Sequence, residues 1–350
     1  MLSLAVLALA GAAFGASNGK PLPPSTDSFD FIALGDNRPV GAGLPPTPIF
    51  RSILQDVANL GPAFVLSSGD IVFGNDEPIE TYRSECEAIK GLIDGLPCPF
   101  YNAPGNHEIA ERKEFYAEYT KRFGATFGSF KFGKWKFIEI STEELGASPG
   151  ISDAELGWLN NELSSPEPKV VFHHHPLFTR KGNDETGAGV KNHDMVAAMY
   201  KTGNVKYAFQ GHDHVFNHQT HDGIEYYITG GAGAPLDAAP EEGGFFHFLV
   251  VHVTGDKVEI NPIPAGAIQL TPIPNGLIVG NYSDFDLHFH HLSVPCAGKP
   301  SGASAKSVKK KSTKEIPVKL VGGGEANGSY TAILDLTAPP HAPTFIELSP

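Results

Sequence analysis

The pattern of apolar and polar positions changes period along the first part of the chain. Residues 29–34 form an apolar run, and Thr47-Pro48 then offers a helix N-cap followed by proline at the first helical position. Apolar side chains recur at helical spacing over residues 49–57, and residues 64–66 form a second apolar run. This order predicts a strand, a helix and a second strand.

The same alternation of strand and helix patterns continues to about residue 253. Residues 130–137 alternate apolar and basic side chains around Gly133, which predicts a hairpin. Ser152 and Glu155 form the sequence of a capping box and open an amphipathic helix. Further β-like runs lie at residues 170–172, 205–209, 226–229 and 245–253. Strands that alternate with helices favour the α/β class.

The pattern changes after Pro264, where helical periodicity disappears. Short β-like runs, such as residues 285–289 and 330–336, are separated by proline and glycine. They predict a small, sandwich-like all-β domain over residues 265–350. Residues 298–315 are rich in serine and lysine, and we expect them to form a solvated loop.

Polar motifs follow five of the apolar runs, in one fixed order. They are Gly35-Asp36-Asn37-Arg38, Gly69-Asp70-Ile71-Val72, Gly105-Asn106-His107-Glu108, His174-His175-Pro176 and Gly211-His212-Asp213-His214. Sites in open α/β sheets form where the strands end. The motifs offer two carboxylates, one amide and three imidazoles, a donor set that can hold two divalent metals side by side.

Such a donor set suits the hydrolysis of phosphate esters. These esters resist attack because an anionic nucleophile must approach an anionic centre. Two neighbouring metal ions lower the pKa of a bound water, neutralise the phosphate oxygens and orient an in-line displacement. The protein must supply a carboxylate that bridges the ions and neutral donors that hold each one.

The ordered motifs resemble those of the calcineurin-like metallophosphoesterases, a superfamily that includes the purple acid phosphatases. The resemblance covers about residues 28–262, and we expect the catalytic domain to span residues 28–264. It implies an α/β fold of two packed mixed β-sheets flanked by helices, a four-layer sandwich, followed here by the C-terminal β-rich domain. It also implies that a metal-bound hydroxide hydrolyses a phosphoric ester.

The resemblance also assigns roles to individual residues. The metal ligands it implies are Asp36 on the first metal, Asp70 as the bridge, Asn106 and His212 on the second metal, His214 on the first, and His174. His107 is expected to stabilise the transition state or protonate the leaving group, and Glu108 to orient His107. The metal ions would be Fe, Mn or Zn, since aspartate, asparagine and histidine ligands suit all three.

Two positions depart from the family pattern. Many members carry a histidine ligand where this chain has Arg38, and the purple acid phosphatases carry a tyrosine ligand where it has Phe73. The first metal is therefore expected to lack a third side-chain ligand, with water in its place, and the enzyme is not expected to be purple. Arg38 suits a phosphate oxygen and is our candidate substrate contact, the alternative being a surface salt bridge.

Other histidines have less specific surroundings. His173 and His175 flank a ligand, and strand alternation predicts that one points inward and one outward; His175 is our candidate for binding substrate. His218 and His221 are expected in a solvated loop. His288 and His290, with the adjacent His291, either line the polar face of a strand or form another metal site.

The net charge limits the classes of binding partner, and the cysteine count limits the disulfide bonds. The formal net charge of −13 argues against broad nucleic-acid binding, which needs a basic surface. Phosphorylated small molecules or surface-bound phosphates remain suitable, because bound metals reverse the local field. Cys86 and Cys98 can form a bridge or remain buried thiols, with Cys296 left over.

The chain begins with an apolar run followed by small residues. Residues 1–17 are typical of a secretory signal peptide and favour a secreted or periplasmic protein. The run is shorter than the ~20 apolar residues that span a bilayer, and we identify no other transmembrane segment.

The sequence as a whole favours a metal-dependent phosphoric ester hydrolase, with phosphomonoesters ahead of phosphodiesters. The choice between the two ester classes depends on pocket shape set by loops such as residues 178–193. An alternative is a catalytically degenerate module that binds phosphate or a partner. A further alternative makes the β-rich domain a specificity element that binds polysaccharide or a cell surface.

Overall fold

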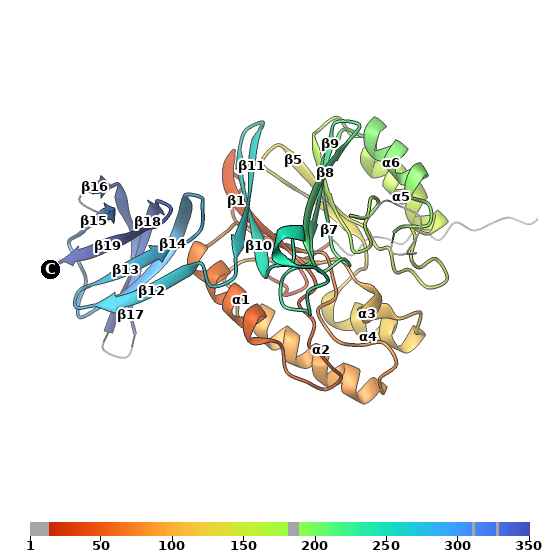
Figure 1. Ribbon diagram of the computed structural model, residues 1–350, viewed down its shortest axis with the longest axis horizontal. Coiled ribbons are helices and arrows are strands. Elements are labelled where there is room, and N and C mark those ends of the chain that lie inside the picture. The colour runs from red at the N-terminus through yellow and green to blue at the C-terminus, as the bar shows by residue number, and fades with distance from the viewer. Residues whose placement is uncertain (1–13, 181–188, 310–311, 327–328) are drawn as a thin grey trace, which may run out of the picture.

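The computed structural model of the chain describes residues 14–180, 189–309, 312–326 and 329–350. Figure 1 shows a larger body of sheets and helices beside a smaller body of strands at the C-terminal end. The first thirteen residues of the expected signal peptide lie outside the described residues, as do residues 181–188 of the expected specificity loop and Lys310-Lys311.

The first sheet of the larger body has five strands in the order β11-β10-β1-β2-β3. Their bounds are β1 (Ser28–Leu34), β2 (Val65–Ser67), β3 (Phe100–Asn102), β10 (His247–Thr254) and β11 (Lys257–Pro264). β1, β2 and β3 run parallel, and β10 and β11 are antiparallel to their neighbours. The helices that follow these strands are α1 (Pro48–Leu60), α2 (Ile79–Asp94), α3 (Asn106–Ile109) and α4 (Lys113–Phe123). They lie together on one side of this sheet (Figure 1).

The second sheet has six strands in the order β4-β5-β6-β7-β9-β8. Their bounds are β4 (Gly128–Phe132), β5 (Trp135–Glu139), β6 (Lys169–Phe172), β7 (Val205–Gln210), β8 (Phe216–His221) and β9 (Ile224–Thr229). β5, β6, β7 and β9 are parallel. The helices α5 (Asp153–Leu163) and α6 (His193–Thr202) cover the outer face of this sheet (Figure 1).

An aromatic core joins the inner faces of the two sheets. The ring centres of Phe64 and Phe137 are 4.9 Å apart, and those of Phe31 and Phe64 are 5.2 Å apart. Aromatic pairs of this kind stabilise a core beyond the area that they bury. With helices on both outer faces, the larger body is the four-layer α/β sandwich that the sequence predicts.

The predicted helix starts and the predicted hairpin are present. Thr47 caps α1 by accepting a hydrogen bond from the Phe50 amide at 3.2 Å. Ser152 accepts one from the Glu155 amide at 3.3 Å, but the Glu155 carboxylate accepts from the Ser141 amide instead of reaching back. The capping box of α5 is therefore only half formed, because its glutamate ties α5 to the end of the neighbouring strand. β4 and β5 form the predicted hairpin.

The smaller body consists of two antiparallel sheets. One has the order β12-β13-β19-β15-β16, with bounds β12 (Ile268–Ile273), β13 (Gly276–Asn281), β19 (Ala342–Ser349), β15 (Gly302–Lys309) and β16 (Ser312–Ile316). The other has the order β14-β18-β17, with bounds β14 (Leu287–Cys296), β18 (Ser329–Ala338) and β17 (Val318–Ala326). Buried side chains of β14 belong to the same apolar core as those of α1, so the two bodies share one continuous core.

The expectation of a solvated loop over residues 298–315 is wrong, since most of these residues form the hairpin of β15 and β16. Ala305 and Ser307 are buried on one face of β15, while Lys306 between them is partly exposed. The small buried side chains hide the period-two pattern, because alanine and serine do not mark an apolar face in the sequence.

His218 and His221 lie in β8 and not in a loop. His218 stacks on Tyr227 and pairs with Glu225 at 2.5 Å, and His221 stacks on Phe178 with ring centres 3.8 Å apart. Both imidazoles stack on aromatic side chains. A strand pattern expects apolar residues at such packed positions, so the two histidines hide the strand in the sequence.

Three further features bear on the sequence interpretation. All three cysteines are free; Cys86 and Cys98 are buried, and burial raises their thiol pKa values to about 12. Phe14, within the expected signal peptide, stacks on Tyr101 with ring centres 5.7 Å apart, a contact that removal of residues 1–17 would abolish. Among the described residues, no helix has the length and apolar character to cross a membrane.

Asp56 is a buried carboxyl group on α1 whose Oδ2 atom has no hydrogen-bond partner among the described residues. Burial raises its pKa from 3.8 to about 7. The unfolded chain therefore loses the proton near pH 4, whereas the folded chain keeps it until about pH 7. Between these two pH values the folded chain binds the Asp56 proton and the unfolded chain does not. The contribution of Asp56 to the free energy of unfolding is therefore highest below the unfolded pKa and falls as the pH rises through the folded pKa.

Asp56→Asn is accordingly expected to raise the free energy of unfolding at pH 8 by roughly 2–4 kcal/mol and to change it little at pH 4. Urea unfolding at the two pH values measures the difference. Asp27→Asn, at an exposed position, is the matched control and should show no such dependence on pH. An equal effect of Asp56→Asn at both pH values would contradict this assignment.

Candidate metal centre

Parallel strands of both sheets deliver the sequence-predicted ligands to one edge of the sandwich. Asp36, Asp70 and Asn106 follow β1, β2 and β3 of the first sheet, and His174 and His212 follow β6 and β7 of the second. The carboxyl ends of parallel strands meet at one edge, so motifs more than 100 residues apart in sequence come together.

Three of these ligands adopt a backbone conformation that is unusual for residues other than glycine. The φ angles of Asp36, Asp70 and His212 are 59°, 55° and 71°. Each such conformation costs on the order of 1–3 kcal/mol and persists only where surrounding contacts hold it. Ten non-glycine residues of the described chain have a positive φ, and three of them are ligands whose side chains converge here.

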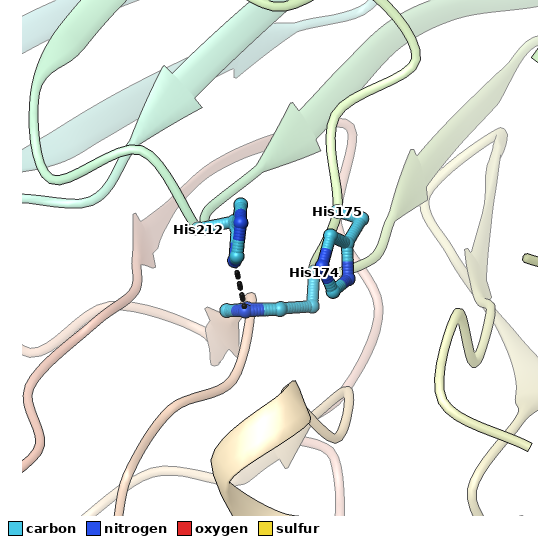
Figure 2. Close-up of side chains that lie close together, drawn as sticks. All are labelled: His174, His175 and His212. Carbon is cyan, nitrogen blue, oxygen red and sulfur yellow. Dashed lines mark hydrogen bonds between the residues drawn. The ribbon is translucent and has the colours of Figure 1, made fainter. Parts of the chain in front are cut away.

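One group of donor atoms comes from Asp70, Asn106, His174 and His212. The Nδ1 of His174 lies 2.8 Å from the Ser68 carbonyl oxygen, which can only accept, so Nδ1 carries the proton and Nε2 is a free lone pair. That Nε2 lies 2.9 Å from Asn106 Oδ1, 3.4 Å from Asp70 Oδ1 and 3.3 Å from His212 Nδ1. Figure 2 shows the rings of His174 and His212 directed at each other.

These separations fit a metal ion. Ligands at about 2.0–2.2 Å around a tetrahedral ion lie roughly 3.3 Å from one another. An unprotonated imidazole nitrogen, an amide oxygen and a carboxylate oxygen all carry lone pairs, and their convergence is unfavourable unless a cation lies among them. The donor set of this group therefore fits the ion that the sequence predicts.

A second group consists of Asp36, Asp70 and His214, with one donor atom from each within 4.8 Å of the others. The Nε2 of His214 lies 3.5 Å from Asp36 Oδ1. Its Nδ1 donates to the Pro235 carbonyl oxygen at 2.6 Å, which leaves Nε2 free to bind a metal. Asp70 is the one residue that belongs to both groups, as a bridging ligand must.

The charge states of Asp70, His174 and His212 suit metal binding, whereas Asp36 needs a nearby cation to favour its carboxylate form. Burial raises the pKa of Asp36 well above its usual value, and the neighbouring Asp70 raises it further. Burial acts in the same direction on Asp70, but His174, His107 and His212 outweigh it and lower its pKa. Burial lowers the pKa of His174 and takes that of His212 to about 2, so both are neutral imidazoles, the form that ligates metals.

His107 lies at the rim of the centre. Its backbone amide donates to Asp70 Oδ1 at 3.1 Å, its Nδ1 contacts the Phe73 carbonyl oxygen, and its Nε2 lies 3.7 Å from Asp70 Oδ2. The Nδ2 of Asn75 lies 3.0 Å and 3.3 Å from the two ring nitrogens. The carbonyl fixes the tautomer with the proton on Nδ1, and Nε2 faces the centre.

Glu108 has a different task from the one that the resemblance implies. Its carboxylate accepts hydrogen bonds from the amides of Asp70 at 2.8 Å, Ile71 at 2.7 Å, Val72 at 3.1 Å and Gly105 at 2.6 Å. Glu108 therefore fixes the loop that carries Asp70, and not the ring of His107. Its buried carboxylate satisfies four backbone amides of the two loops that follow β2 and β3.

Arg38 belongs to the centre and is not a surface salt bridge. Its Nε lies 3.8 Å from Asp70 Oδ2, and its side chain is 15% exposed. The guanidinium carbon lies 5.8 Å from the ring centre of Phe73, so the two residues that depart from the family pattern contact each other. The buried Nε has no hydrogen-bond partner among the described residues, which leaves a donor available to a ligand.

The expectation that one of His173 and His175 points outward is wrong, because both are buried. β6 ends at Phe172, so strand alternation does not extend to them. His173 donates from Nδ1 to the His175 carbonyl oxygen at 2.9 Å. His175 pairs with Glu143 at 2.5 Å, and its ring centre lies 4.0 Å from that of His212 (Figure 2).

Sequence reasoning missed three residues that position the site. Glu143 holds His175, Asn75 contacts His107, and Asp237 accepts from the His214 amide at 2.8 Å. None of them belongs to a motif or follows a predicted strand directly. Only the folded chain brings them to the centre, and no signal in the sequence marks them.

Comparison with known proteins finds a family model that matches part of the chain and solved structures that share its fold. Residues 45–216 match the family model described as calcineurin-like phosphoesterase. This range contains the motifs of Asp70, Asn106, His174, His212 and His214, and Asp36 precedes it. A search of the curated proteins found no match.

Two solved structures are similar to this chain at low sequence identity. GAP50, described as the anchor in the inner membrane complex of Plasmodium, is 13% identical over 68% of this chain and 85% of its own, with a TM-score of 0.51. A dimetal phosphatase from Danio rerio is 15% identical over 67% of this chain and 95% of its own, with a TM-score of 0.50. Likeness at these identities establishes the fold.

Proposed function

We propose that this chain, which belongs to the calcineurin-like phosphoesterases and is a metal-dependent phosphoric ester hydrolase, acts preferentially on phosphomonoesters. The observation that carries the proposal is the position of Arg38 beside Asp70, which belongs to the group with Asp36 and His214 and lies 3.4 Å from His174 of the other group. A monoester dianion presents one more anionic oxygen than a diester, and a guanidinium suits that oxygen.

In the proposed reaction, the metal ions and the chain's own residues have different roles. Two bound metal ions supply a nucleophile at neutral pH and neutralise phosphate oxygens. Arg38 would donate to a further phosphate oxygen and orient the ester. As the imidazolium, with a proton on each ring nitrogen, His107 would give the Nε2 proton to the leaving oxygen, and the contact of its Nδ1 with the Phe73 carbonyl holds the ring for that transfer.

The ester preference is tested with p-nitrophenyl phosphate and bis-p-nitrophenyl phosphate. Metal-stripped protein is assayed with Mn, Zn or Fe added back, since the ligands suit all three metals. We expect kcat/KM for the monoester to exceed that for the diester by about tenfold or more, the ratio given by one charged hydrogen bond. A diester rate equal to or above the monoester rate would reverse the preference.

Arg38→Met is expected to lower kcat/KM for the monoester by about 10–100-fold, because it removes a charged hydrogen bond to the phosphate. Bound metal per chain should stay the same, since arginine does not ligate metals. Arg51→Met, at an exposed position of α1, is the control. Unchanged kinetics, or a loss of bound metal, would contradict a role in substrate binding.

A second candidate is a degenerate module that binds phosphate or a partner without turnover. The observation that favours it is Arg38, which occupies the position of a metal ligand and lies 3.8 Å from the bridging carboxylate. GAP50, which shares the fold, is described as an anchor. Absence of turnover with any of the three metals, in protein shown to be folded, would favour this module over the enzyme.

Export and the role of the β-rich domain are also proposals. We propose that the chain is secreted or periplasmic, on the strength of the apolar residues at its start. Cell fractionation followed by N-terminal sequencing tests this. We further propose that the β-rich domain brings the active site to surface-bound phosphates, which predicts that the full chain binds a polysaccharide or cell-surface preparation.

A further inference from the structure

A second cluster of potential metal ligands lies where the β-rich domain meets the first sheet. It consists of Asp30 on β1 and of His288 and His290 on β14, and one donor atom of each lies within 4.8 Å of the others. Asp30 and the ligand Asp36 are six residues apart in sequence. At about 3.3 Å per strand residue, the two sites are roughly 20 Å apart.

The contacts within this cluster bring donor atoms to a common point. His290 Nε2 lies 2.9 Å from Asp30 Oδ2, and the rings of His288 and His290 stack with centres 4.1 Å apart. The 2.9 Å separation is close to the roughly 3.3 Å between neighbouring ligands of a tetrahedral ion. Two imidazoles from one strand and a carboxylate from another body of the protein supply the donor types that transition metals prefer.

Further groups hold these three side chains in place. His252 on β10 lies 2.5 Å from Asp30 Oδ1, the oxygen that does not face His290. Asp335 on β18 lies 3.2 Å from His288 Nε2 and 3.9 Å from His290 Nδ1. Asp335 therefore supports the ring of His288, as carboxylates commonly support metal-ligating histidines by fixing the ring and raising its basicity, and lies beyond hydrogen-bond distance of His290.

Burial and charge at the cluster also suit a cation. The Asp30 side chain is 6% exposed, whereas those of His290 and His288 are 24% and 33% exposed. The two carboxylates of Asp30 and Asp335 balance the charge of one divalent ion.

The cluster is accessible from a cavity. Asp30 and His290 line a cavity of about 610 Å³ whose other walls include Pro21, Pro62 and Phe132. Water can therefore reach an ion there and complete its coordination, and the ion has a path of entry. Most of the cavity wall is apolar; its polar side chains outside the cluster are those of Thr26, Ser28 and the exposed His291.

We propose that Asp30, His288 and His290 bind a divalent transition-metal ion, Zn²⁺ by the chemistry of the ligands, which ties the β-rich domain to the phosphoesterase domain. Asp335 and His252 hold the ligands from behind. The ion is separate from the two at the catalytic centre, so the protein binds three metal ions when fully loaded. Because the ligands come from both bodies, binding stabilises their arrangement and raises the melting temperature.

The test compares the full chain with His290→Gln and His288→Gln after dialysis of metal-stripped protein against Zn²⁺. Glutamine retains a hydrogen-bond donor for Asp30 or Asp335 but is a poor zinc ligand. His291→Gln is the matched control, because His291 is exposed on the same strand and lies outside the cluster. Bound zinc is measured by atomic emission, folding by circular dichroism, and melting with and without zinc.

We expect each of the two variants to bind one zinc ion fewer per chain than the wild type and the His291→Gln control. Each should also lose part of the rise in melting temperature that zinc produces, while p-nitrophenyl phosphate hydrolysis stays at the wild-type level. If all four proteins bind the same amount of zinc, hydrogen bonds and ion pairs alone hold the cluster together, and the proposal is overturned. If either folded variant loses turnover together with zinc, the ion is not separate from the catalytic centre, which also overturns it.

Discussion

Asp70→Asn is expected to reduce metal-restored hydrolysis of p-nitrophenyl phosphate by about 1,000-fold or more. Asp70 belongs to the group with Asp36 and His214 and lies 3.4 Å from His174 of the other group, so its carboxylate is the charge that can bridge two ions. Loss of that charge costs several kcal/mol of transition-state stabilisation, and each 1.36 kcal/mol is a factor of ten. Asparagine tolerates the left-handed backbone at this position, so the loop should remain in place.

The measurement is kcat/KM together with bound metal per chain. Asp76→Asn is the control, since it makes the same chemical change at an exposed position six residues further along the same loop. We expect the control to match the wild type and the Asp70 variant to lose bound metal as well as turnover. Hydrolysis that persists within tenfold of the wild type in Asp70→Asn would exclude Asp70 as the bridge.

Gly105→Ala is expected to lower kcat/KM by about 100-fold, although it changes no ligand. A Cβ atom at Gly105 would lie 2.1 Å from Asp70 Oδ1 and 2.6 Å from the Asp70 amide nitrogen. The loop after β3 must therefore withdraw, or the Asp70 carboxylate must rotate out of the centre. A displacement of about 1 Å at a reacting geometry typically costs that factor.

Gly157→Ala provides the comparison for the glycine prediction. Gly157 lies within α5, and a Cβ atom there would meet no atom within 4 Å. That substitution should leave hydrolysis unchanged and stabilise the helix by about 0.5–1 kcal/mol. Equal kinetics for both glycine variants would show that the loop after β3 yields without moving Asp70.

The strand ends that carry the site could be predicted from the sequence because the physical cause is local. Asp36, Asp70 and His212 each follow an apolar run, and parallel strands in an α/β sandwich place such residues at one edge. The family resemblance that the ordered motifs carry then implied the ligand set. The sequence leaves Arg38 open between a substrate contact and a surface salt bridge, and the structure places it beside Asp70.

The supporting contacts could not be predicted, because they join segments that only the folded chain brings together. Asp237 holds His214 from 23 residues away, and Glu143 holds His175 from 32 residues away. Glu108 lies next to His107 in sequence but turns its carboxylate to the Asp70 loop, since the orphan amides there need an acceptor. Adjacency in sequence therefore misled us about its partner.

The β-rich domain shows where pattern recognition failed for a different reason. The buried face of β15 consists of small residues such as Ala305 and Ser307, which carry no apolar signal.

The sequence left His288 and His290 open between a polar strand face and a metal site. The contact that favours a metal comes from Asp30, some 260 residues earlier, and no local pattern contains it.

The central claim is a centre of two metal ions bridged by Asp70. The most direct measurement is anomalous diffraction from crystals of the full chain loaded with Mn²⁺ or Zn²⁺. We predict two peaks about 3.5–4 Å apart with the Asp70 carboxylate between them, one near Asn106, His174 and His212 and the other near Asp36 and His214. A single peak at this edge of the sandwich, or two peaks without Asp70 between them, would contradict the claim.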